Sequence, residues 1–471
     1  MIFSSVFFLY VFLPIVLVLY YVAPFKLKNL VLLIFSLIFY AWGEPVYVFL
    51  MAFSILINYV FGLEIADFRR KHDMRCAKAT MIVCVAVDLL VLGFYKYYGF
   101  LISNINGIFH ASIPVKELAL PIGISFYTFQ TLSYIVDVYW GNVKAQKNLI
   151  SFGAYVTMFP QLIAGPIVRY ADIEKQLGNR KINRAKFGEG AIWFIQGLGK
   201  KALIANNIGN VFDNIQAMGA ANTSMLSAWI GAFAYTMQIY FDFGGYSDMA
   251  IGLGKMLGFE FNKNFDYPYI SRSVTEFWRR WHISLGTWFR EYVYIPLGGN
   301  RVSFLKHIRN LLIVWALTGL WHGAAWNFVA WGVYYGILLI LEKYVLKDVL
   351  ERFPDWAKHV YTLFLVVIGW MLFAAPSMGS AMSYIGTMFG IGGAGIIDGT
   401  GWYYLKSALI LGVIAAVGST PLVYSKIEKV LYDRRNPSGK MWVAIYYIAV
   451  LLIATAYLVN STYNPFLYFR F

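Results

Sequence analysis

The chain has 471 residues, of which 59% are hydrophobic, 19% are aromatic and only 13% are charged. A soluble protein of this length needs far more charge to cover its surface, so the composition excludes a soluble class and indicates a helical membrane protein. The net charge of +15 comes from Lys and Arg that cluster in loops between apolar segments, which is typical of membrane topology and does not indicate nucleic-acid binding.

The first part of the chain contains four apolar segments, near residues 2–24, 29–42, 46–63 and 79–101. Most of them approach the about 20 residues that a helix needs to cross about 30 Å of hydrocarbon. The first segment has no basic start and no small-residue cleavage site, so we expect a retained helix and not a signal peptide. The basic loop after the third segment is expected on the cytoplasmic side, which places the N-terminus outside.

An apolar segment between two basic loops, LISFGAYVTMFPQLIAGP, cannot be a simple span. The loops 141–148 and 169–186 on either side of it both carry Lys and Arg, so both are expected on the cytoplasmic side. The segment must then enter the membrane and return, or lie flat at its surface. Its Gly and Pro residues favour a broken element, which protein or a wet cavity has to surround at membrane depth.

A second segment, residues 310–342, also has basic residues at both ends and predicts a re-entrant pair of helices. Gly319 and Gly323 are expected near the bend, which places Trp321 and His322 at the deep end. An ionisable side chain at membrane depth is costly and indicates a function. His322 is therefore a candidate general base, for which an unperturbed pKa of about 6.5 is suitable. The alternative is a core histidine that is hydrogen-bonded to the backbone.

The remaining spans are predicted near residues 120–140, 226–243, 359–375, 403–421 and 441–460. The loop 376–402 has no Lys or Arg and is expected outside, and the last span returns the C-terminus to the outside. The prediction is an all-α polytopic membrane protein with about 11 spans and additional re-entrant and interfacial helices. We expect one membrane domain, with N-terminal helices, a motif-bearing core and C-terminal helices in residues 1–119, 120–342 and 343–471.

A second histidine, His282, lies in the stretch EFWRRWHISLGTWFREY. At helical spacing it shares a face with Trp278, Leu285 and Phe289, so we expect it to face protein or lipid and not water. This pattern leaves both a functional role and an interfacial packing role open.

Basic residues in and around the same stretch could bind the phosphates of an anionic cofactor on the cytoplasmic side. Most of them could instead extend to the membrane interface. The five candidates are Arg272, Arg279, Arg280, Arg290 and Arg301.

Carboxylates also occur in apolar surroundings. Asp242 and Asp248 bracket two glycines in YFDFGGYSDMAIGLG, and Asp88 lies inside a predicted span. Paired carboxylates can perform acid–base chemistry, but a broken helix with hydrogen-bonded partners explains them as well, and we favour structural roles. The stretch GLGKK at 197–201 lacks the spacing of a phosphate-binding loop. No metal-ligand spacing occurs, so a metal site is not expected.

Five stretches resemble, in order, the motifs of the membrane-bound O-acyltransferases, especially those of the bacterial alginate and peptidoglycan O-acetyltransferase branch. They are LPIGISFYTFQTLSYIVDVYWG, FPQLIAGPIVRY, FDFGGYSDMAIGLGKMLGF, EFWRRWHISLGTWFREYVYIPLGGNR and LTGLWHGAAWNF. The likeness extends over nearly the whole chain and is dense between residues 120 and 342. One departure is WGVYYG at 331–336, where family members often have His before the final glycine.

The resemblance implies a ring of helices around a thin centre, with His322 as the family's membrane histidine and His282 as its second histidine. It implies acetyl-CoA as a cytoplasmic acyl donor, without a permanently bound cofactor. It also implies a bacterial inner-membrane location, an extracytoplasmic polysaccharide acceptor and a separate SGNH-type acetyltransferase as partner. The expected function is O-acetylation of an exported or cell-wall polysaccharide.

Two alternatives stay open at this point. One is the transfer of D-alanyl or another acyl group to a cell-envelope polymer. The other is a transporter or flippase of an acylated lipid or polymer, which should show inverted repeats and paired charges at mid-membrane. The sequence has no clear repeat.

The last residues, NPFLYFRF, combine Phe, Tyr and Arg in a way that suits an aromatic membrane anchor. They also resemble the F-x-Y-x-R-F ending of bacterial relatives, in which the tyrosine is proposed to carry the acyl group. The resemblance therefore implies Tyr468 as a candidate acyl carrier. A phenol has a pKa of about 10 and needs a nearby base to become a good nucleophile at neutral pH.

Overall fold

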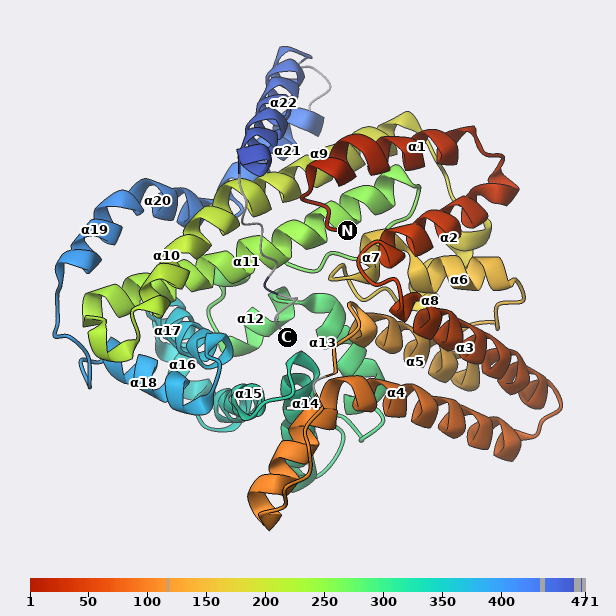
Figure 1. The fold of residues 1–471 in the computed structure, drawn as a ribbon, viewed down its shortest axis with the longest axis horizontal. Coiled ribbons are helices and arrows are strands. Elements are labelled where there is room, and N and C mark those ends of the chain that lie inside the picture. The colour runs from red at the N-terminus through yellow and green to blue at the C-terminus, as the bar shows by residue number, and fades with distance from the viewer. Residues whose placement is uncertain (117, 433–436, 461–466, 468–471) are drawn as a thin grey trace. The chain divides into compact units, whose positions relative to one another are not determined.

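The computed structural model describes residues 1–116, 118–432, 437–460 and 467. Every regular element within these residues is a helix, so the predicted all-α class is confirmed (Figure 1). Contacts divide the chain into two compact units, Met1–Phe194 with Met249–Asn262 and Ile195–Asp248 with Lys263–Phe471. Two compact units can belong to one membrane domain, so the single domain and the ring of helices stay predictions.

The first unit is built mainly from three mutually packed helices, α3, α4 and α5, and from α2, which packs against α6. Its helices are η1 (Phe8–Phe12), α1 (Leu13–Val22), α2 (Phe25–Ala41), α3 (Tyr47–Arg70), α4 (Met74–Phe109), α5 (Ile124–Trp140), α6 (Leu149–Thr157), α7 (Phe159–Leu162) and α8 (Tyr170–Gly178). Two further helices, α9 (Arg184–Gly199) and α11 (Met225–Met256), each continue from one unit into the other.

Asp88 of α4 is buried among α3, α4 and α5. Its carboxylate oxygens accept hydrogen bonds from Asn58 Nδ2 at 2.9 Å and from Thr131 Oγ1 at 3.2 Å. These bonds satisfy a buried polar group and agree with the structural role that we favoured for Asp88. Cys76 is exposed, Cys84 is buried, and both are free thiols.

The segment LISFGAYVTMFPQLIAGP forms two short helices, α6 and α7, which meet at Met158. Pro160 near the start of α7 has no N–H to continue the preceding helix. All residues from 152 to 168 are buried, and Gln161 Nε2 donates to the carbonyl oxygen of Tyr155 at 2.7 Å. The prediction of a broken element that protein surrounds is thus confirmed.

The second unit contains the two histidines and most of the remaining helices (Figure 1). They are η2 (Lys200–Ala205), α10 (Asn206–Ala217), η3 (Ala220–Asn222), η4 (Pro268–Ile270), α12 (Val274–Arg280), α13 (Ile283–Phe289), η5 (Arg290–Tyr294), α14 (Phe304–His322), α15 (Trp326–Tyr344), α16 (Lys347–Arg352), α17 (Asp355–Ala374), α18 (Met378–Met388), α19 (Gly399–Ser407), α20 (Leu409–Gly418), α21 (Leu422–Tyr432) and α22 (Pro437–Asn460). η2 and η5 are π-helical, and η3 and η4 are 3₁₀ turns.

Four helices of the described residues are long and apolar enough to cross a membrane, namely α3, α4, α17 and Ser438–Asn460 of α22. α19 and α20 together pass the same test but are bent by 56°, which makes up to five spans. These elements agree with the predicted segments 46–63, 79–101, 359–375, 403–421 and 441–460. The total of about 11 spans, which follows from segment length in the sequence, stays a prediction.

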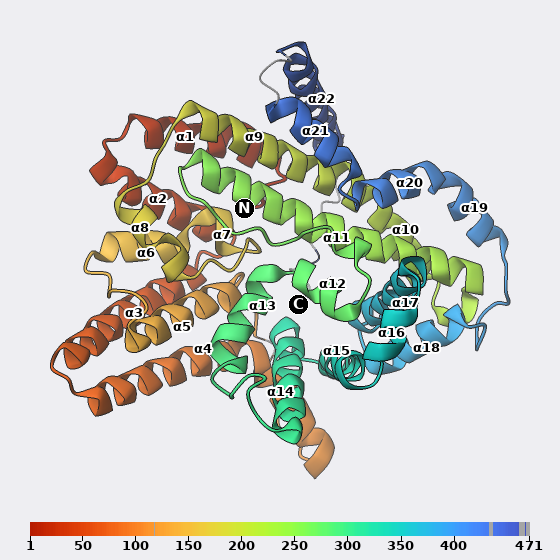
Figure 2. The ribbon, with the colours of Figure 1, turned by 180° about the vertical axis from the view of Figure 1, so that it is seen from behind.

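α14 and α15 follow one another along the chain (Figure 2). His322 is the last residue of α14, so it lies at the junction of the two helices, as the sequence predicted. A Cβ atom on Gly319 would lie 2.2 Å from the carbonyl oxygen of Phe328, and one on Gly332 would lie 2.2 Å from that of Trp315. The two backbones therefore approach as closely as only glycine permits. The chain turns at residues 323–325, so Gly323 lies at the bend as predicted. Gly319 does not: it lies inside α14, one helical turn earlier, and serves helix packing.

Candidate active site

His322 is the last residue of α14 and is surrounded by aromatic side chains. Its side chain is buried, with 6% of its surface exposed. Its ring centroid lies 5.1 Å from that of Trp331 and 5.2 Å from that of Phe373, and both pairs meet nearly at right angles. Trp321 contributes a further ring at 5.1 Å. These rings hold the imidazole in place and keep bulk water away from it.

His282 joins two helices that the sequence predicted to be one. Trp281 is extended, and His282 has left-handed dihedral angles, φ 46° and ψ 52°, so the helix ends at Arg280 and a new one begins at Ile283. The predicted helical face through His282 is therefore wrong, although its side chain is buried as expected. A left-handed non-glycine residue is uncommon and often marks a functional site. The His282 and His322 ring centroids are 6.5 Å apart.

Asn264 determines which nitrogen of His282 carries the proton. Asn264 Oδ1 accepts hydrogen bonds from Ser284 N at 3.2 Å and from Ser284 Oγ at 2.9 Å. The backbone N–H can only donate, so this atom of Asn264 must be its oxygen. His282 Nδ1 lies 3.2 Å from the same oxygen and must therefore donate its proton to it. Nε2 is then the nitrogen with the lone pair. Burial lowers the pKa of His282 to about 3, so its ring is neutral at physiological pH.

A cavity of about 190 Å³, here named the Arg290 cavity, reaches both histidines. Its walls are mainly aromatic and aliphatic side chains of α12, α13, η5 and α14. Arg290 also lines this cavity and is exposed, so the guanidinium lies at the surface end of the cavity. The cavity thus joins a cation near the surface to a buried neutral imidazole.

A second space adjoins His322 and is named the Asp242 cavity. It has a volume of about 10 Å³, close to the space for one water molecule, and Asp242, Trp331 and Leu467 line it with His322. A larger cavity of about 640 Å³ is lined by Ser380 and is named the Ser380 cavity. Phe373 and Leu467 line both this cavity and the Asp242 cavity. His322 therefore lines two cavities, the Arg290 cavity and the Asp242 cavity.

The comparison with known families identifies this arrangement. The model of the membrane-bound O-acyltransferase family matches residues 144–385. This range includes His282, His322 and every residue that lines the three cavities except Leu467.

This chain belongs to the membrane-bound O-acyltransferase family.

The family predicted from the sequence motifs is therefore confirmed, and the protein is a multi-pass membrane enzyme of the acyltransferase class. A probable alginate O-acetylase of Pseudomonas putida is 40% identical over 495 residues, which cover 100% of both chains. One of Pseudomonas aeruginosa is 46% identical over 396 residues, which cover 83% of this chain and 75% of the relative. A peptidoglycan O-acetyltransferase of Helicobacter pylori is 32% identical over 431 residues, with 84% and 81% covered.

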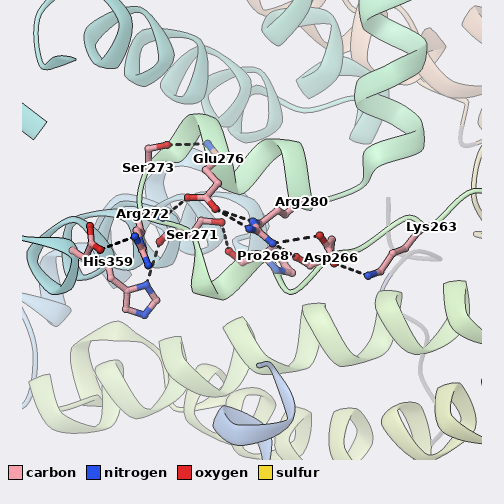
Figure 3. A network of polar contacts seen from close by, with 10 residues as sticks. Lys263, Asp266, Pro268, Ser271, Arg272, Ser273, Glu276, Arg280 and His359 are labelled. Atoms are coloured by element: carbon pink, nitrogen blue, oxygen red, sulfur yellow. Dashed lines mark hydrogen bonds and ion pairs between the residues drawn. The ribbon is translucent and has the colours of Figure 1, made fainter. Parts of the chain in front are cut away.

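Two of the five candidate arginines of this acyltransferase are held by carboxylates of the second unit (Figure 3). Arg280 Nη2 lies 2.9 Å from Glu276 Oε1, and Arg280 Nη1 lies 3.3 Å from Asp266 Oδ2. Arg272 Nη1 lies 2.6 Å from Asp355 Oδ2. These ion pairs hold the residues before α12 and at its end. They also neutralise two of the five arginines that could bind an anionic ligand.

The other three arginines, Arg279, Arg290 and Arg301, are exposed. Within the part of the chain that the structure describes, none of them forms an ion pair. Of the three, Arg290 lines the cavity that contains the histidines. Arg290 is therefore the candidate arginine that offers its charge to this cavity.

Glu342 of α15 holds the start of α12 in the acyltransferase. Its carboxylate accepts hydrogen bonds from Val274 N at 2.6 Å, from Thr275 N at 2.8 Å and from Thr275 Oγ1 at 2.6 Å. The first amides of a helix have no partner within the helix, and a negative charge there is favourable. Glu342 thus ties α12, which leads to His282, to the helix that carries Trp331.

The structure also places the remaining sequence candidates. Asp242 and Asp248 form ion pairs with Lys201 and Lys200, at 2.5 and 2.7 Å. Tyr468 lies outside the described residues, although its neighbour Leu467 lies within them.

Sequence reasoning missed Asn264, Glu342 and Lys201. Lys201 had a signal: two lysines in an apolar stretch, GLGKK, require buried acids elsewhere, and FDFGGYSD supplies two. Asn264 and Glu342 had none, because each acts through the backbone or ring of a residue distant in sequence.

Proposed function

We propose that this acyltransferase passes acetyl groups from cytoplasmic acetyl-CoA across a bacterial inner membrane, for O-acetylation of an exported or cell-wall polysaccharide. Relatives that match most of this chain are named alginate or peptidoglycan O-acetyltransferases, which favours acetyl over D-alanyl transfer. One observation carries the proposal: His322 lines two cavities, one with Arg290 and the other with Asp242 and Leu467. A single buried base can then serve a donor on one side and an acceptor on the other.

The chemistry assigned to each group follows from its surroundings. Arg290 binds a phosphate of acetyl-CoA, and the apolar wall of the Arg290 cavity receives the thioester arm. His322 takes the proton of the acceptor hydroxyl, whose oxygen attacks the thioester carbonyl carbon. The C–S bond breaks, and the sulfur leaves as the thiol of coenzyme A with that proton. His282, with its lone pair on Nε2, orients water or substrate near the reacting carbonyl.

The acceptor in this scheme is the hydroxyl of Tyr468. The products of the first step are then an acetyl ester on Tyr468 and free coenzyme A. An extracytoplasmic SGNH-type acetyltransferase moves the acetyl group from the phenol oxygen to its own serine and on to the polysaccharide. Both termini of the chain lie on the extracytoplasmic side in this proposal. Leu467, which precedes Tyr468, lines the Asp242 cavity together with His322 and supports this assignment.

The direction of transfer is tested with membrane vesicles and radiolabelled acetyl-CoA. Vesicles that expose the basic segment 64–78, which includes the turn between α3 and α4, should consume the donor, and sealed vesicles of the opposite orientation should not. Arg290→Gln should raise KM for acetyl-CoA about tenfold with kcat within a factor of two, because one charge-assisted hydrogen bond to the donor is lost. Arg352→Gln, at the exposed end of α16, is the matched control and should change neither constant. Equal use of the donor from both faces would contradict the proposal.

The acyl-carrier role is tested with Tyr468→Phe, which keeps the ring and removes only the hydroxyl. We expect no polymer acetylation, because an attacking oxygen is absent. Mass spectrometry of the wild-type C-terminal peptide should show one acetyl group that the variant lacks. An interfacial anchor predicts nearly full activity instead, since Phe and Tyr both favour the interface. Normal acetylation by Tyr468→Phe would leave only the anchor.

A further inference from the structure

A buried ion pair connects η2 with α11 in the second unit. Lys201 Nζ lies 2.5 Å from Asp242 Oδ1, and the two residues are 3% and 2% exposed. A buried ion pair is often no better for stability than apolar residues of similar volume, because both charges have to leave water. A gain in folding stability is therefore a weak explanation for this pair. The charge on Asp242 needs another role.

The second oxygen of the same carboxylate binds the C-terminal part of the chain. Asp242 Oδ2 accepts a hydrogen bond from Leu467 N at 2.8 Å, across 225 positions of sequence. The Leu467 residue is 5% exposed, so this bond is shielded from water. A hydrogen bond to an ionised acceptor is stronger than one between neutral groups. Asp242 thus serves two partners, with Lys201 on one oxygen and a backbone amide on the other.

This contact lies directly beside the candidate base. Asp242, Leu467 and His322 line the same enclosed Asp242 cavity. The bond between Asp242 and Leu467 therefore fixes where the backbone at position 467 lies relative to the imidazole. A shift of about 1 Å in a reacting group can lower a rate by about 10²-fold, so such a fixed position matters for transfer.

A neighbouring ion pair provides an internal comparison. Lys200 Nζ lies 2.7 Å from Asp248 Oδ2, and it also connects η2 with α11. Its side chains are more exposed, at 18% and 11%, and Asp248 does not line the Asp242 cavity. If the two ion pairs served only to connect η2 with α11, loss of either pair would have the same effect. The Lys201–Asp242 pair differs in its contact with Leu467.

We propose that the Lys201–Asp242 pair is the docking site for the backbone N–H of Leu467, and that it fixes position 467 of the chain against His322. The ligand of the site is a peptide backbone N–H followed by an aromatic hydroxyl residue, supplied by the chain itself. Lys201 keeps Asp242 ionised and oriented, and Asp242 holds the backbone. Both are positioning residues, because they act through position 467. The proposal rests on the proposed function, for which the segment delivers the acceptor hydroxyl.

Docking is measured first without reference to activity. Leu467→Cys is introduced together with Cys76→Ser, which removes the exposed native thiol. The introduced thiol should react slowly with a maleimide, since position 467 is buried. Adding Lys201→Met or Asp242→Asn should raise the labelling rate about tenfold, because the charge-assisted bond is weakened. Lys200→Met is the matched control and should leave labelling slow.

Activity is then measured on the same positions with Leu467 intact. Lys201→Met and Asp242→Asn should lower polymer acetylation about tenfold or more, with KM for acetyl-CoA unchanged, since neither residue lines the Arg290 cavity. A merely structural role would lower the amount of folded protein and affect both constants. Size-exclusion profiles and thermal midpoints near those of the wild type exclude this cause. The charge swap Lys201→Asp with Asp242→Lys replaces either variant that fails to fold.

The outcomes separate this proposal from the proposed function. Slow labelling and normal acetylation in both Lys201→Met and Asp242→Asn would overturn the docking site, even if His322 is essential. Fast labelling in these variants with normal acetylation would show that the segment docks there but that its register is irrelevant, which also overturns the proposal. Fast labelling with low acetylation supports it. Full activity of a His322 variant would instead defeat the proposed function and leave the labelling result unaffected.

Discussion

His322→Ala should abolish polymer acetylation while the protein is still produced and folded. The side chain lies at the end of α14, is buried, and lines two cavities. His282, which lines the Arg290 cavity with it, cannot take its place as the base, since burial holds the pKa of His282 near 3. Loss of a general base lowers a rate by about 10²–10⁴-fold.

The measurement is acetyl content of the polymer in cells that carry the variant, normalised to the amount of protein in the membrane. His359→Ala is the matched control, because His359 Nδ1 contacts the backbone oxygen of Ser271 and neither residue lines the two cavities. The control should acetylate normally. Acetylation by His322→Ala at even a tenth of the wild-type level would remove this histidine from the role of base.

The second large effect is expected from the addition of one methyl group, Gly319→Ala. The new Cβ would lie 2.2 Å from the carbonyl oxygen of Phe328, an approach that real Cβ atoms essentially never show. Backbone cannot rotate away as a side chain can, so α14 and α15 must separate. Overpacking of this kind typically costs about 1–3 kcal/mol, and it displaces His322 and Trp331 at the same time.

A glycine in an open position provides the control for this prediction. Gly93 lies inside α4, and a Cβ there would meet nothing within 4 Å. Gly93→Ala should be neutral or stabilise the protein by about 0.5–1 kcal/mol, since glycine is unfavourable inside a helix. The thermal midpoint and the yield of monodisperse protein are compared for both variants. If Gly319→Ala melts with the wild type, the close approach of the two backbones is not what holds the pair together.

Parts of this fold could be predicted because each depends on a local pattern. Apolar length indicated α3, α4, α17 and α22, and Gly and Pro between basic loops indicated the break between α6 and α7. The position of His322 at the junction of two helices followed from the same reasoning. Charge in loops and apolar length are properties of short stretches, so a single sequence is enough to show them.

The site depends on contacts between distant segments, which a single sequence does not show. The break before His282 is an example. Its stretch has helical spacing throughout, yet Asn264 Oδ1 accepts hydrogen bonds from the His282 ring and from the backbone N–H of Ser284 at this break. Arg280 was a candidate phosphate ligand until its carboxylate partners were placed beside it. Tertiary partners decided both cases, and helical periodicity carries no information about them.

The hydrogen bond between His282 and Asn264 has a consequence for proton movement. Asn264 Oδ1 accepts the hydrogen bond but cannot take up the proton, so the proton on Nδ1 does not pass along this bond. A proton wire needs a residue that takes a proton at one atom and releases it at another. His282 therefore cannot hand a proton on to Asn264. A proton that His282 takes up at Nε2 does not leave through this hydrogen bond, so the bond holds the ring in place and conducts no protons.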